Sequence, residues 1–334
     1  MDPLTHIAVS IAASRAGLNR TTRLATPMLV VSGLAADLDW LTALFGPRSF
    51  LIGHRTVTHS LVGTAAIAIV TAICFTLAAR KHPKSPIQFS NALIICAIGA
   101  VLHLALDISN SYGVKLLWPL SDRWFALDIL PKFDLWILMF LLAGILLPML
   151  FRMVTEEIGA KQKSKSGTTG AILAFVLLLL YSSGRYVLHT RAIDLLTSRL
   201  YQGGAPLVAG AFPDSPSPFH WSGAIITDAA LFRVEVPVVF GNFDPFSAKL
   251  FYKPEPSPAF DAARATQTAV LFLNFARIPR ARIEKNEHGY QVEITDMRFE
   301  IGSPPGRSIA AIIDLDSQAR VVHEELRFGD LFER

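Results

Sequence analysis

Seven imidazole and carboxylate side chains lie inside or beside long apolar stretches of this sequence. Burying such groups at membrane depth is costly, so they usually face the interior of a helical bundle and have a function. Imidazole and carboxylate are also ligands for borderline and hard divalent metals. The seven residues are His6, Asp37, Asp39, His54, His59, His103 and Asp107. Their types predict a metal site.

His103 and Asp107 have the spacing of two ligands on one helical face. They are four residues apart, so in a helix they project from the same side. Asp37 and Asp39 are two residues apart, and in a regular helix they would point roughly 160° away from each other. Both can bind one ion only where the helix ends or is distorted. Otherwise, one of the two carboxylates orients a ligating histidine.

Two further histidines flank a short polar segment. His54 and His59 enclose residues 55–58, immediately before an apolar stretch. Thr58 or Ser60 suits the N-terminal cap of a helix in that stretch. We therefore expect the two histidines at the entrance of this helix.

The elements that position these residues are predicted to be membrane-spanning helices. Of the 334 residues, 51% are hydrophobic and 17% charged, and the mean hydropathy is +0.41. Soluble proteins contain about 25% charged residues, so the apolar excess indicates contact with lipid. About six stretches approach the roughly 17–25 residues that a span requires, and the first is short and interrupted by His6 and Arg15. They are residues 4–18, 24–45, 61–79, 92–108, 133–151 and 171–188.

Basic residues are distributed unequally between the loops that connect these stretches. The loops 15–23, 80–90 and 152–169 hold ten lysines and arginines, whereas the alternate loops hold five. Short basic loops stay cytoplasmic, so we expect both chain ends and all seven candidate ligands at the outer face of a cytoplasmic (inner) membrane. The net charge of +4 is explained by these loops, and no nucleic-acid partner is expected.

After about residue 200 the pattern changes to short segments separated by proline and glycine. Alternating or β-branched residues predict strands, and turn residues between them predict hairpins. The predicted strands are residues 231–240, 269–276, 281–284, 290–299, 308–315 and 321–328. We therefore expect an α-helical polytopic membrane domain over residues 1–195. A small β-rich extramembrane domain over residues 200–334 is expected to follow it on the outer face.

Three further charged residues are candidates for contact with a substrate. Arg55 and Arg123 lie in loops on the predicted outer side, where a guanidinium can bind an anionic group such as phosphate. Such arginines can equally anchor lipid headgroups. Asp128 is a further acidic candidate in the same region. Cys74 and Cys96 lie inside apolar stretches and define neither a disulfide framework nor a zinc motif.

The order of these motifs resembles that of a known family. The matching blocks are Thr5-His6, Ala36-Asp37-Leu38-Asp39, the HRTVTHS sequence of residues 54–60, and the HLALDISNSYG sequence of residues 103–113. They resemble the YdjM-like (LexA-regulated type) membrane-bound metal-dependent hydrolases. The continuation through residues 117–123 and Asp128 is similar to a branch with a C-terminal extension. The resemblance covers roughly residues 1–155. It implies a metal site at the seven residues named above and a hydrolase activity.

Our leading hypothesis from the sequence is a membrane-bound metal-dependent hydrolase. One or two divalent ions (zinc, manganese or magnesium) would acidify water and polarise an ester oxygen. Asp39 or Asp37, where not used as a ligand, would serve as general base. Because the site is predicted at headgroup level, we expect a lipid or lipid-linked (phospho)ester as substrate.

Two alternatives come from other classes of protein. A transporter or ion relay could use the same intramembrane acids and histidines. A structural membrane protein could use the metal only to hold helices together, while the β-rich domain binds a partner that the sequence does not identify. Hydrolysis is favoured over transport because the candidate residues collect at one face and form no path across the bilayer.

Overall fold

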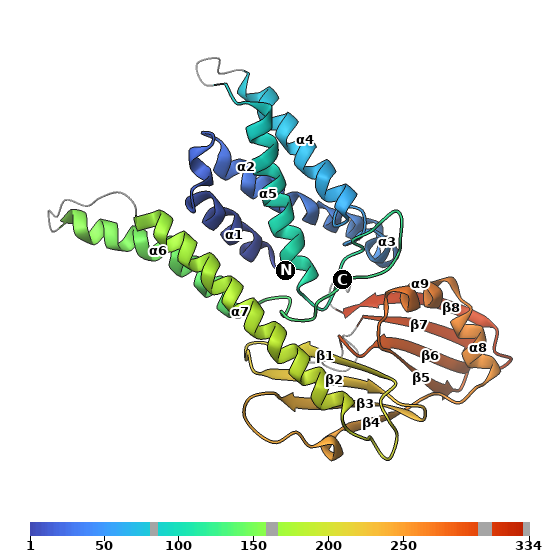
Figure 1. Ribbon diagram of the computed structural model, residues 1–334. Coiled ribbons are helices and arrows are strands. Elements are labelled where there is room, and N and C mark those ends of the chain that lie inside the picture. The colour runs from blue at the N-terminus through green and yellow to red at the C-terminus, as the bar shows by residue number, and fades with distance from the viewer. Residues whose placement is uncertain (81–85, 158–165, 300–308, 330–334) are drawn as a thin grey trace. The chain divides into compact units, whose positions relative to one another are not determined.

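The computed structural model describes residues 1–80, 86–157, 166–299 and 309–329 (Figure 1). Two compact units make up the chain. The first contains Met1–Trp40 and Gly53–Val187, and the second contains Leu41–Ile52 and Leu188–Arg334. Five lysines that contributed to the predicted orientation lie outside the described residues. They are Lys81, Lys84, Lys161, Lys163 and Lys165.

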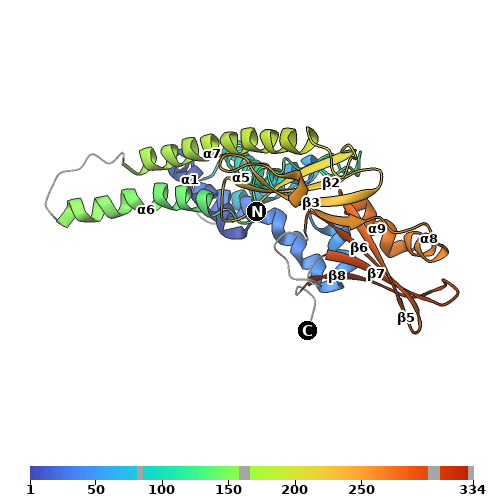
Figure 2. The same ribbon diagram turned by 90° about the horizontal axis from the view of Figure 1, so that it is seen from below.

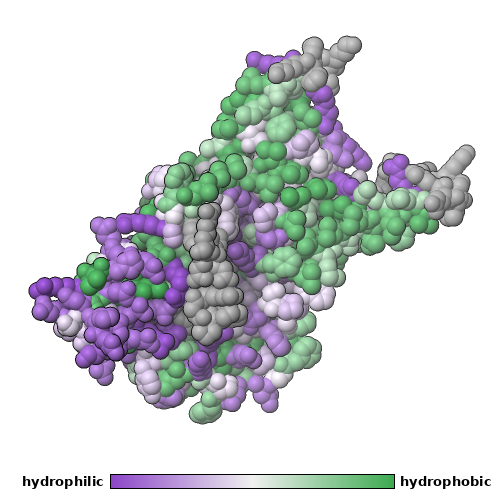
Figure 3. Space-filling model, turned by 180° about the vertical axis from the view of Figure 1, so that it is seen from behind, coloured by the Kyte–Doolittle hydropathy of each residue, from purple (hydrophilic) through white to green (hydrophobic). Residues whose placement is uncertain are grey.

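Five helical segments in the described part of the chain are long and apolar enough to cross a membrane. They are formed by α2 (Ala25–Leu34) continued by the 3₁₀ helix η2 (Ala35–Phe45), α4 (Leu61–Ala79), α5 (Phe89–Ile108), α6 (Leu135–Glu157) and α7 (Ser166–Thr197). Hydrophobic side chains cover much of the helical surface visible in Figure 3. The predicted polytopic helical membrane domain is therefore confirmed.

The first apolar stretch forms a shorter helix, α1 (Pro3–Arg15). Its 13 residues extend about 20 Å, which is less than the hydrocarbon core of about 30 Å. Asp2 caps this helix, because its Oδ1 accepts a hydrogen bond of 2.9 Å from the amide of Thr5. At the other end, Arg15 donates to the carbonyl of Ile145 in α6 at 2.7 Å. Two further short helices, η1 (Leu18–Arg20) and α3 (Pro47–Gly53), lie in connections.

Small residues allow α1, α2 and α5 to approach one another closely. A Cβ atom added at Gly33 of α2 would lie 2.6 Å from Oγ of Ser10 in α1. A Cβ atom at Gly99 of α5 would lie 2.7 Å from the carbonyl oxygen of Leu29 in α2. Close backbone contact through small residues is how helices associate in lipid, where burial of apolar surface gives little driving force. This contact lies four residues before His103.

Helices α6 and α7 lie side by side as an antiparallel pair (Figures 1 and 2). Their closest approach is again at glycine, since a Cβ at Gly144 would lie 2.6 Å from the carbonyl oxygen of Gly170. Asp134 caps the start of α6 by accepting from the amides of Trp136 and Ile137 at 3.0 and 3.1 Å. It also accepts from the hydroxyl of Tyr181 in α7 at 3.0 Å. The pair is thus joined by packing and by a buried carboxylate.

The second unit contains two four-stranded antiparallel sheets, each with its strands in sequence order. The first consists of β1 (Val208–Pro213), β2 (His220–Ile226), β3 (Ala230–Pro237) and β4 (Lys249–Tyr252), and the second of β5 (Pro279–Asn286), β6 (Gly289–Asp296), β7 (Ile309–Asp316) and β8 (Val321–Phe328). The 3₁₀ helix η3 (Pro245–Ser247) precedes β4, and the helices α8 (Pro258–Arg264) and α9 (Gln267–Phe275) lie between β4 and β5. The expected β-rich part of the chain is confirmed.

One predicted strand is a helix, and three strands were not predicted. Residues 269–276 read as a strand because they are apolar, but α9 begins at Thr266, whose hydroxyl accepts from the amide of Ala269 at 3.2 Å. Phe272 and Phe275 then share its buried face, as residues three apart do in a helix. The capping threonine was the signal that the strand prediction overlooked. β1 and β2 were missed because their glycine, proline and serine content weakens the alternation, and β4 because it has only four residues.

The core of the first sheet includes the last turns of α7. Leu196 packs with Trp221 of β2, Phe232 of β3 and Val236 of β3, and all four side chains are buried. Gly223 of β2 provides the space, because a Cβ there would lie 2.6 Å from a methyl group of Leu196. The second unit therefore depends on the end of α7 for part of its core.

Candidate metal centre

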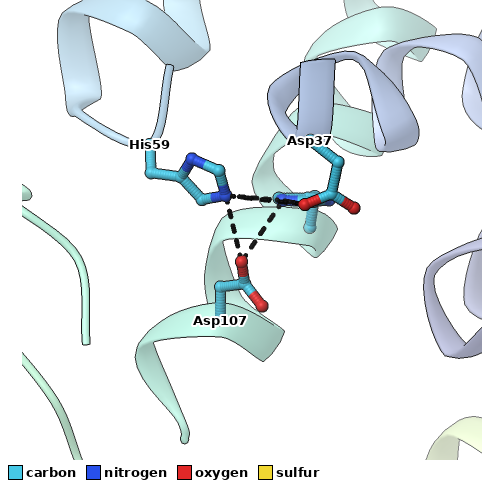
Figure 4. A group of neighbouring side chains, drawn as sticks. Asp37, His59 and Asp107 are labelled. Atoms are coloured by element: carbon cyan, nitrogen blue, oxygen red, sulfur yellow. Dashed lines mark hydrogen bonds and ion pairs between the residues drawn. The ribbon is translucent and has the colours of Figure 1, made fainter. Parts of the chain in front are cut away.

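Four of the predicted residues bring their ligand atoms to one point. Asp37, His59, His103 and Asp107 each offer one atom, and these atoms all lie within 4.8 Å of one another. Figure 4 shows Asp37, His59 and Asp107 pointing toward each other. The imidazoles of His59 and His103 and the carboxylate of Asp107 are almost fully buried, whereas the side chain of Asp37 is 14% exposed. The cluster is therefore an interior site with one carboxylate at its edge.

Three elements position these side chains. α5 carries His103 and Asp107 four residues apart, as the spacing predicted. His59 lies immediately before α4, whose cap is Ser60: its Oγ accepts from the amide of Gly63 at 2.9 Å. Asp37 lies in η2, where the α-helix changes to a 3₁₀ helix at Ala35. This is the helix distortion that the spacing of Asp37 and Asp39 requires.

His103 presents a bare nitrogen to the cluster. Its Nδ1 lies 2.6 Å from the carbonyl oxygen of Gly33. A carbonyl oxygen can only accept, so Nδ1 carries the proton and donates it. The neutral ring then has a lone pair at Nε2, and this atom lies 3.4 Å from Oδ2 of Asp107.

His59 is fixed in the same way by a carboxylate. Its Nδ1 lies 3.1 Å from Oδ2 of Asp39 and 3.0 Å from the hydroxyl oxygen of Thr58, which itself donates to Asp39. Nδ1 therefore carries the proton and Nε2 the lone pair. Burial lowers the pKa of His59 from its ordinary value, which keeps the ring neutral at pH 7. A carboxylate behind a ligating histidine is the usual outer support of a metal ligand.

The atoms that face each other are all acceptors. Nε2 of His59 lies 3.0 Å from Nε2 of His103 and 3.0 Å from Oδ2 of Asp107. Oδ1 of Asp37 lies 3.9 and 3.7 Å from the same two nitrogens. Neither Oδ2 of Asp107 nor Oδ2 of Asp37 has a hydrogen-bond partner among the described residues. Converging lone pairs without a proton to share repel each other, and a cation between them removes that repulsion.

The spacing of these atoms also fits a divalent ion. Ligands about 2.0–2.1 Å from a tetrahedral zinc ion lie roughly 3.4 Å from one another. The separations of 3.0 Å between the two Nε2 atoms and 3.4 Å between His103 and Asp107 are close to that value. Two imidazoles and two carboxylates suit zinc and also manganese. The residues present therefore fit a divalent metal.

Asp39 and His54 lie behind the cluster. Besides Nδ1 of His59, the Asp39 carboxylate faces Nδ1 of His54 at 2.8 Å, the amide of Arg55 at 2.8 Å and the hydroxyl of Thr58 at 2.9 Å. Its oxygens are thus occupied by donors. Burial lowers the pKa of His54 to about 4, against the opposing effect of its hydrogen bond to Asp39. Asp39 thus faces His59 and His54 in the orienting position that its spacing left open. Neither Asp39 nor His54, although both were predicted as ligands, is among the four residues whose ligand atoms converge.

His6 lies against the cluster from α1. Its ring stacks on that of His103 with centroids 3.9 Å apart, and its Nε2 lies 3.4 Å from Oδ1 of Asp107. The side chain is fully buried, and neither ring nitrogen has a hydrogen-bond partner among the described residues. A buried imidazole with two unsatisfied nitrogens is costly. His6 therefore lies beside the cluster, next to Oδ1 of Asp107.

Arg55 places a positive charge next to the cluster. Its two terminal nitrogens donate to Oδ1 of Asp107 at 3.1 Å and to Oδ1 of Asn110 at 2.9 Å. The guanidinium lies 5.0 Å from the centre of the Tyr112 ring, and Nε has no partner among the described residues. The amino group of Met1 also contacts Asp107. The Asp107 carboxylate therefore contacts the guanidinium through Oδ1 and faces the two histidine nitrogens through Oδ2.

Some predicted residues lie elsewhere, and some neighbours were not predicted. Arg123 is exposed with its guanidinium 5.5 Å from the Phe125 ring. Asp128 is buried in the same connection with a φ of 56°. Sequence reasoning gave no role to Asn110 and treated Thr58 only as a cap. Asn110 follows Asp107 by three residues, and this helical spacing could have indicated a shared face.

Comparison with known proteins agrees with this geometry. A family model described as YdjM inner membrane protein matches residues 1–192, more than half of the chain. The chain belongs to the YdjM family. "Uncharacterized protein YfhP" of Bacillus subtilis (strain 168) is 22% identical over 273 residues, which cover 79% of this chain and 74% of that protein. No solved structure matches. The YdjM match includes the four cluster residues, His6, Asp39 and Arg55, and it confirms the resemblance seen in the sequence.

The support that Asp39 gives to His59 can be tested by an isosteric change. Asp39→Asn removes the charge that faces the proton on Nδ1, so we expect metal affinity to fall about 10–100-fold. Titration of the metal-free protein with Zn²⁺ or Mn²⁺ measures this change. Asp122→Asn is the matched control, because Asp122 is an exposed loop acid paired with Lys115. Equal affinities for the two variants would show that Asp39 has no such role.

Proposed function

We propose that this YdjM protein is a metal-dependent hydrolase of the inner membrane that cleaves a phosphoester of a lipid or lipid-linked molecule. The observation that supports it best is the convergence of two bare imidazole nitrogens and two carboxylates at one interior point. Asp37, His59, His103 and Asp107 would hold the ion, with His6 beside them. A divalent ion bound there supplies acidification of water and polarisation of an ester oxygen.

Asp37 is the carboxylate best placed to accept a proton. The oxygens of Asp39 face four donors, so that residue is held by His54, His59 and its other partners. Asp37, in contrast, turns Oδ1 to the cluster, keeps Oδ2 without a partner among the described residues, and reaches the surface. We assign the role of general base to Oδ2 of Asp37, while its Oδ1 would face the ion, because a general base must lie within reach of the reacting water.

Arg55 supports an anionic substrate. A guanidinium one carboxylate away from a metal site weakens cation binding by repulsion, so metal binding alone does not explain it. Together with the ion it forms a positive surface that favours a charged group, and guanidinium donors match the geometry of phosphate oxygens. This argument favours a phosphoester over a neutral carboxylic ester.

The location of the site in the membrane is part of the proposal. The basic residues Arg15, Arg20, Arg23 and Arg80 lie at the ends of helices opposite to the ends that carry Asp37, His59 and Asp107 in sequence. By the positive-inside rule, these residues support an outer-face location for the cluster, and we propose the same side for the C-terminal unit. A substrate from the outer leaflet would reach the cluster at headgroup level.

A hydrolysis assay on the purified protein tests this function. The full chain in detergent is freed of metal by a chelator and supplied separately with Zn²⁺, Mn²⁺ or Mg²⁺. The substrates are p-nitrophenyl phosphate, bis(p-nitrophenyl) phosphate, p-nitrophenyl acetate and a short-chain phosphatidic acid. We expect metal-dependent cleavage of a phosphoester without any ion gradient, and its loss in Asp37→Asn.

The outcomes separate the competing functions. One bound ion per chain without turnover of any substrate would indicate that the metal only holds helices together. Ion flux in proteoliposomes that depends on Asp37, with no hydrolysis, would favour transport. Cleavage of the acetate alone would overturn the assignment of a phosphoester.

A further inference from the structure

The second unit contains two adjoining hollows at the edges of its sheets. β4 and β5 are each the edge strand of a sheet. Residues of both strands line the larger hollow, of about 560 Å³. A smaller one of about 280 Å³ shares Lys253, Pro254 and Ala281 with it. The two hollows therefore adjoin, and we refer to them together as the depression and to each as a compartment.

The smaller compartment is apolar. Its wall includes Ile226, Leu231, Phe260, Leu273 and Ile294. A cavity of about 150 Å³ lined by apolar side chains accepts benzene, so 280 Å³ has room for a hydrocarbon segment of roughly ten carbons. The volume is close to the lower end of small-molecule sites, about 300 Å³.

The charges around the depression are mainly positive. Of the described residues that line the smaller compartment, the two charged ones are Lys253 and Arg264. Lys253 donates to the carbonyl of Asp228 at 2.9 Å, and the Arg264 guanidinium lies 5.4 Å from the Phe260 ring. Neither contact is with an acidic group, so neither of them neutralises the positive charge.

The larger compartment adds two arginines and one acid. The Arg280 guanidinium lies 4.1 Å from the centre of the Phe251 ring. Arg282 forms an ion pair with Glu284, and Glu255 is the acidic residue of the lining. Apolar space beside a cationic compartment is complementary to a molecule with a hydrocarbon chain and an anionic head.

We propose that this depression binds a single-chain anionic lipid. The chain occupies the apolar compartment between Leu231 and Leu273, and the anionic head lies in the larger compartment against Lys253 and Arg280. The site lies in the C-terminal unit, uses none of the metal-cluster residues, and holds whether or not the cluster hydrolyses a phosphoester.

Photolabelling of the full-length protein tests this site. The chain is transferred from detergent into amphipol, so that micelles do not compete, and is exposed to a diazirine derivative of dodecanoic acid. We expect labelled peptides that contain residues 251–264 or 279–283. Dodecyl phosphate should displace the label, whereas dodecyltrimethylammonium should not.

Three variants make the result specific. Leu273→Trp fills the apolar compartment and should reduce labelling by at least about tenfold. Lys253→Glu/Arg280→Glu should reduce it similarly while leaving the apolar wall intact. Val322→Trp is the control, because Val322 is exposed on β8.

Two results would overturn the proposal. Labelling that is equal in Leu273→Trp and Val322→Trp would show that the label does not enter the depression. Displacement by uncharged dodecanol as effective as by dodecyl phosphate would mean that the site takes a neutral apolar molecule. Circular dichroism of each variant establishes that the fold is retained.

Discussion

The double variant His59→Ala/His103→Ala is expected to purify without a bound divalent ion, whereas the wild type carries about one per chain. Both imidazoles present bare Nε2 atoms 3.0 Å apart to the cluster, so the variant loses both nitrogen ligands. Loss of one outer support already costs about 10–100-fold in affinity, and loss of two direct ligands should cost more than that. Elemental analysis of dialysed protein measures the difference.

This pair is preferable to a change at Asp107. Both histidines are neutral, so their removal leaves the buried Arg55–Asp107 ion pair intact. Removing one partner of a buried pair costs about 3–5 kcal/mol and could unfold the chain. His288→Ala/His323→Ala is the matched control, since it removes two exposed histidines from the second unit. Equal metal content in the two double variants would refute our ligand assignment.

The second expected result separates substrate binding from metal binding. Arg55→Gln should stay folded and retain the metal, because the bound ion still compensates the charge of Asp107, and circular dichroism checks the fold. It should cleave phosphoesters about 10–150-fold more slowly for each charge-assisted hydrogen bond that is lost, since such a bond is worth about 1.5–3 kcal/mol. The reason is that the guanidinium contributes positive charge beside the cluster while Asp107 keeps its place on α5. Values of kcat/KM for bis(p-nitrophenyl) phosphate measure the effect, and metal content is measured on the same sample.

Rate and metal content, measured on Arg55→Gln and on a control variant, together show whether Arg55 binds the substrate. Arg123→Gln serves as the control, because Arg123 is exposed and lies over Phe125. A variant with reduced metal content would show that Arg55 acts through the stability of the site. Wild-type rates on the phosphoester with full metal content would remove Arg55 from substrate recognition.

The membrane part of the fold could be predicted from sequence because its signal is local. In lipid, a long apolar stretch must satisfy its backbone hydrogen bonds internally, and a helix does so whatever its neighbours are. The predicted stretches from residue 24 onward correspond to helices. The spacing of His103 and Asp107 was equally informative, since four residues place two side chains on one helical face. The type of each residue and its position in a span were sufficient for these inferences.

The roles inside the cluster depended on contacts that the sequence does not display. Asp37 and Asp39 look equivalent in sequence, but η2 turns one toward the bare nitrogens and the other toward Thr58 and His54. The acceptor for His103 is a main-chain carbonyl oxygen, and because every residue has one, the sequence cannot indicate which carbonyl will lie there. In the second unit, the apolar content of residues 269–276 was compatible with strand or helix, and only the capping Thr266 distinguishes them.

The protons on the two central histidines are held by acceptors of different kinds. Asp39, which fixes His59, is a side chain and can be lost in a single substitution. The carbonyl of Gly33, which fixes His103, belongs to the main chain, so no side-chain substitution removes the acceptor itself. It changes only if α2 and α5 move apart, and Gly99 sets that distance. A single substitution during evolution can therefore release the proton position of His59 by removing Asp39. The proton position of His103 can change only if the packing of α2 against α5 changes.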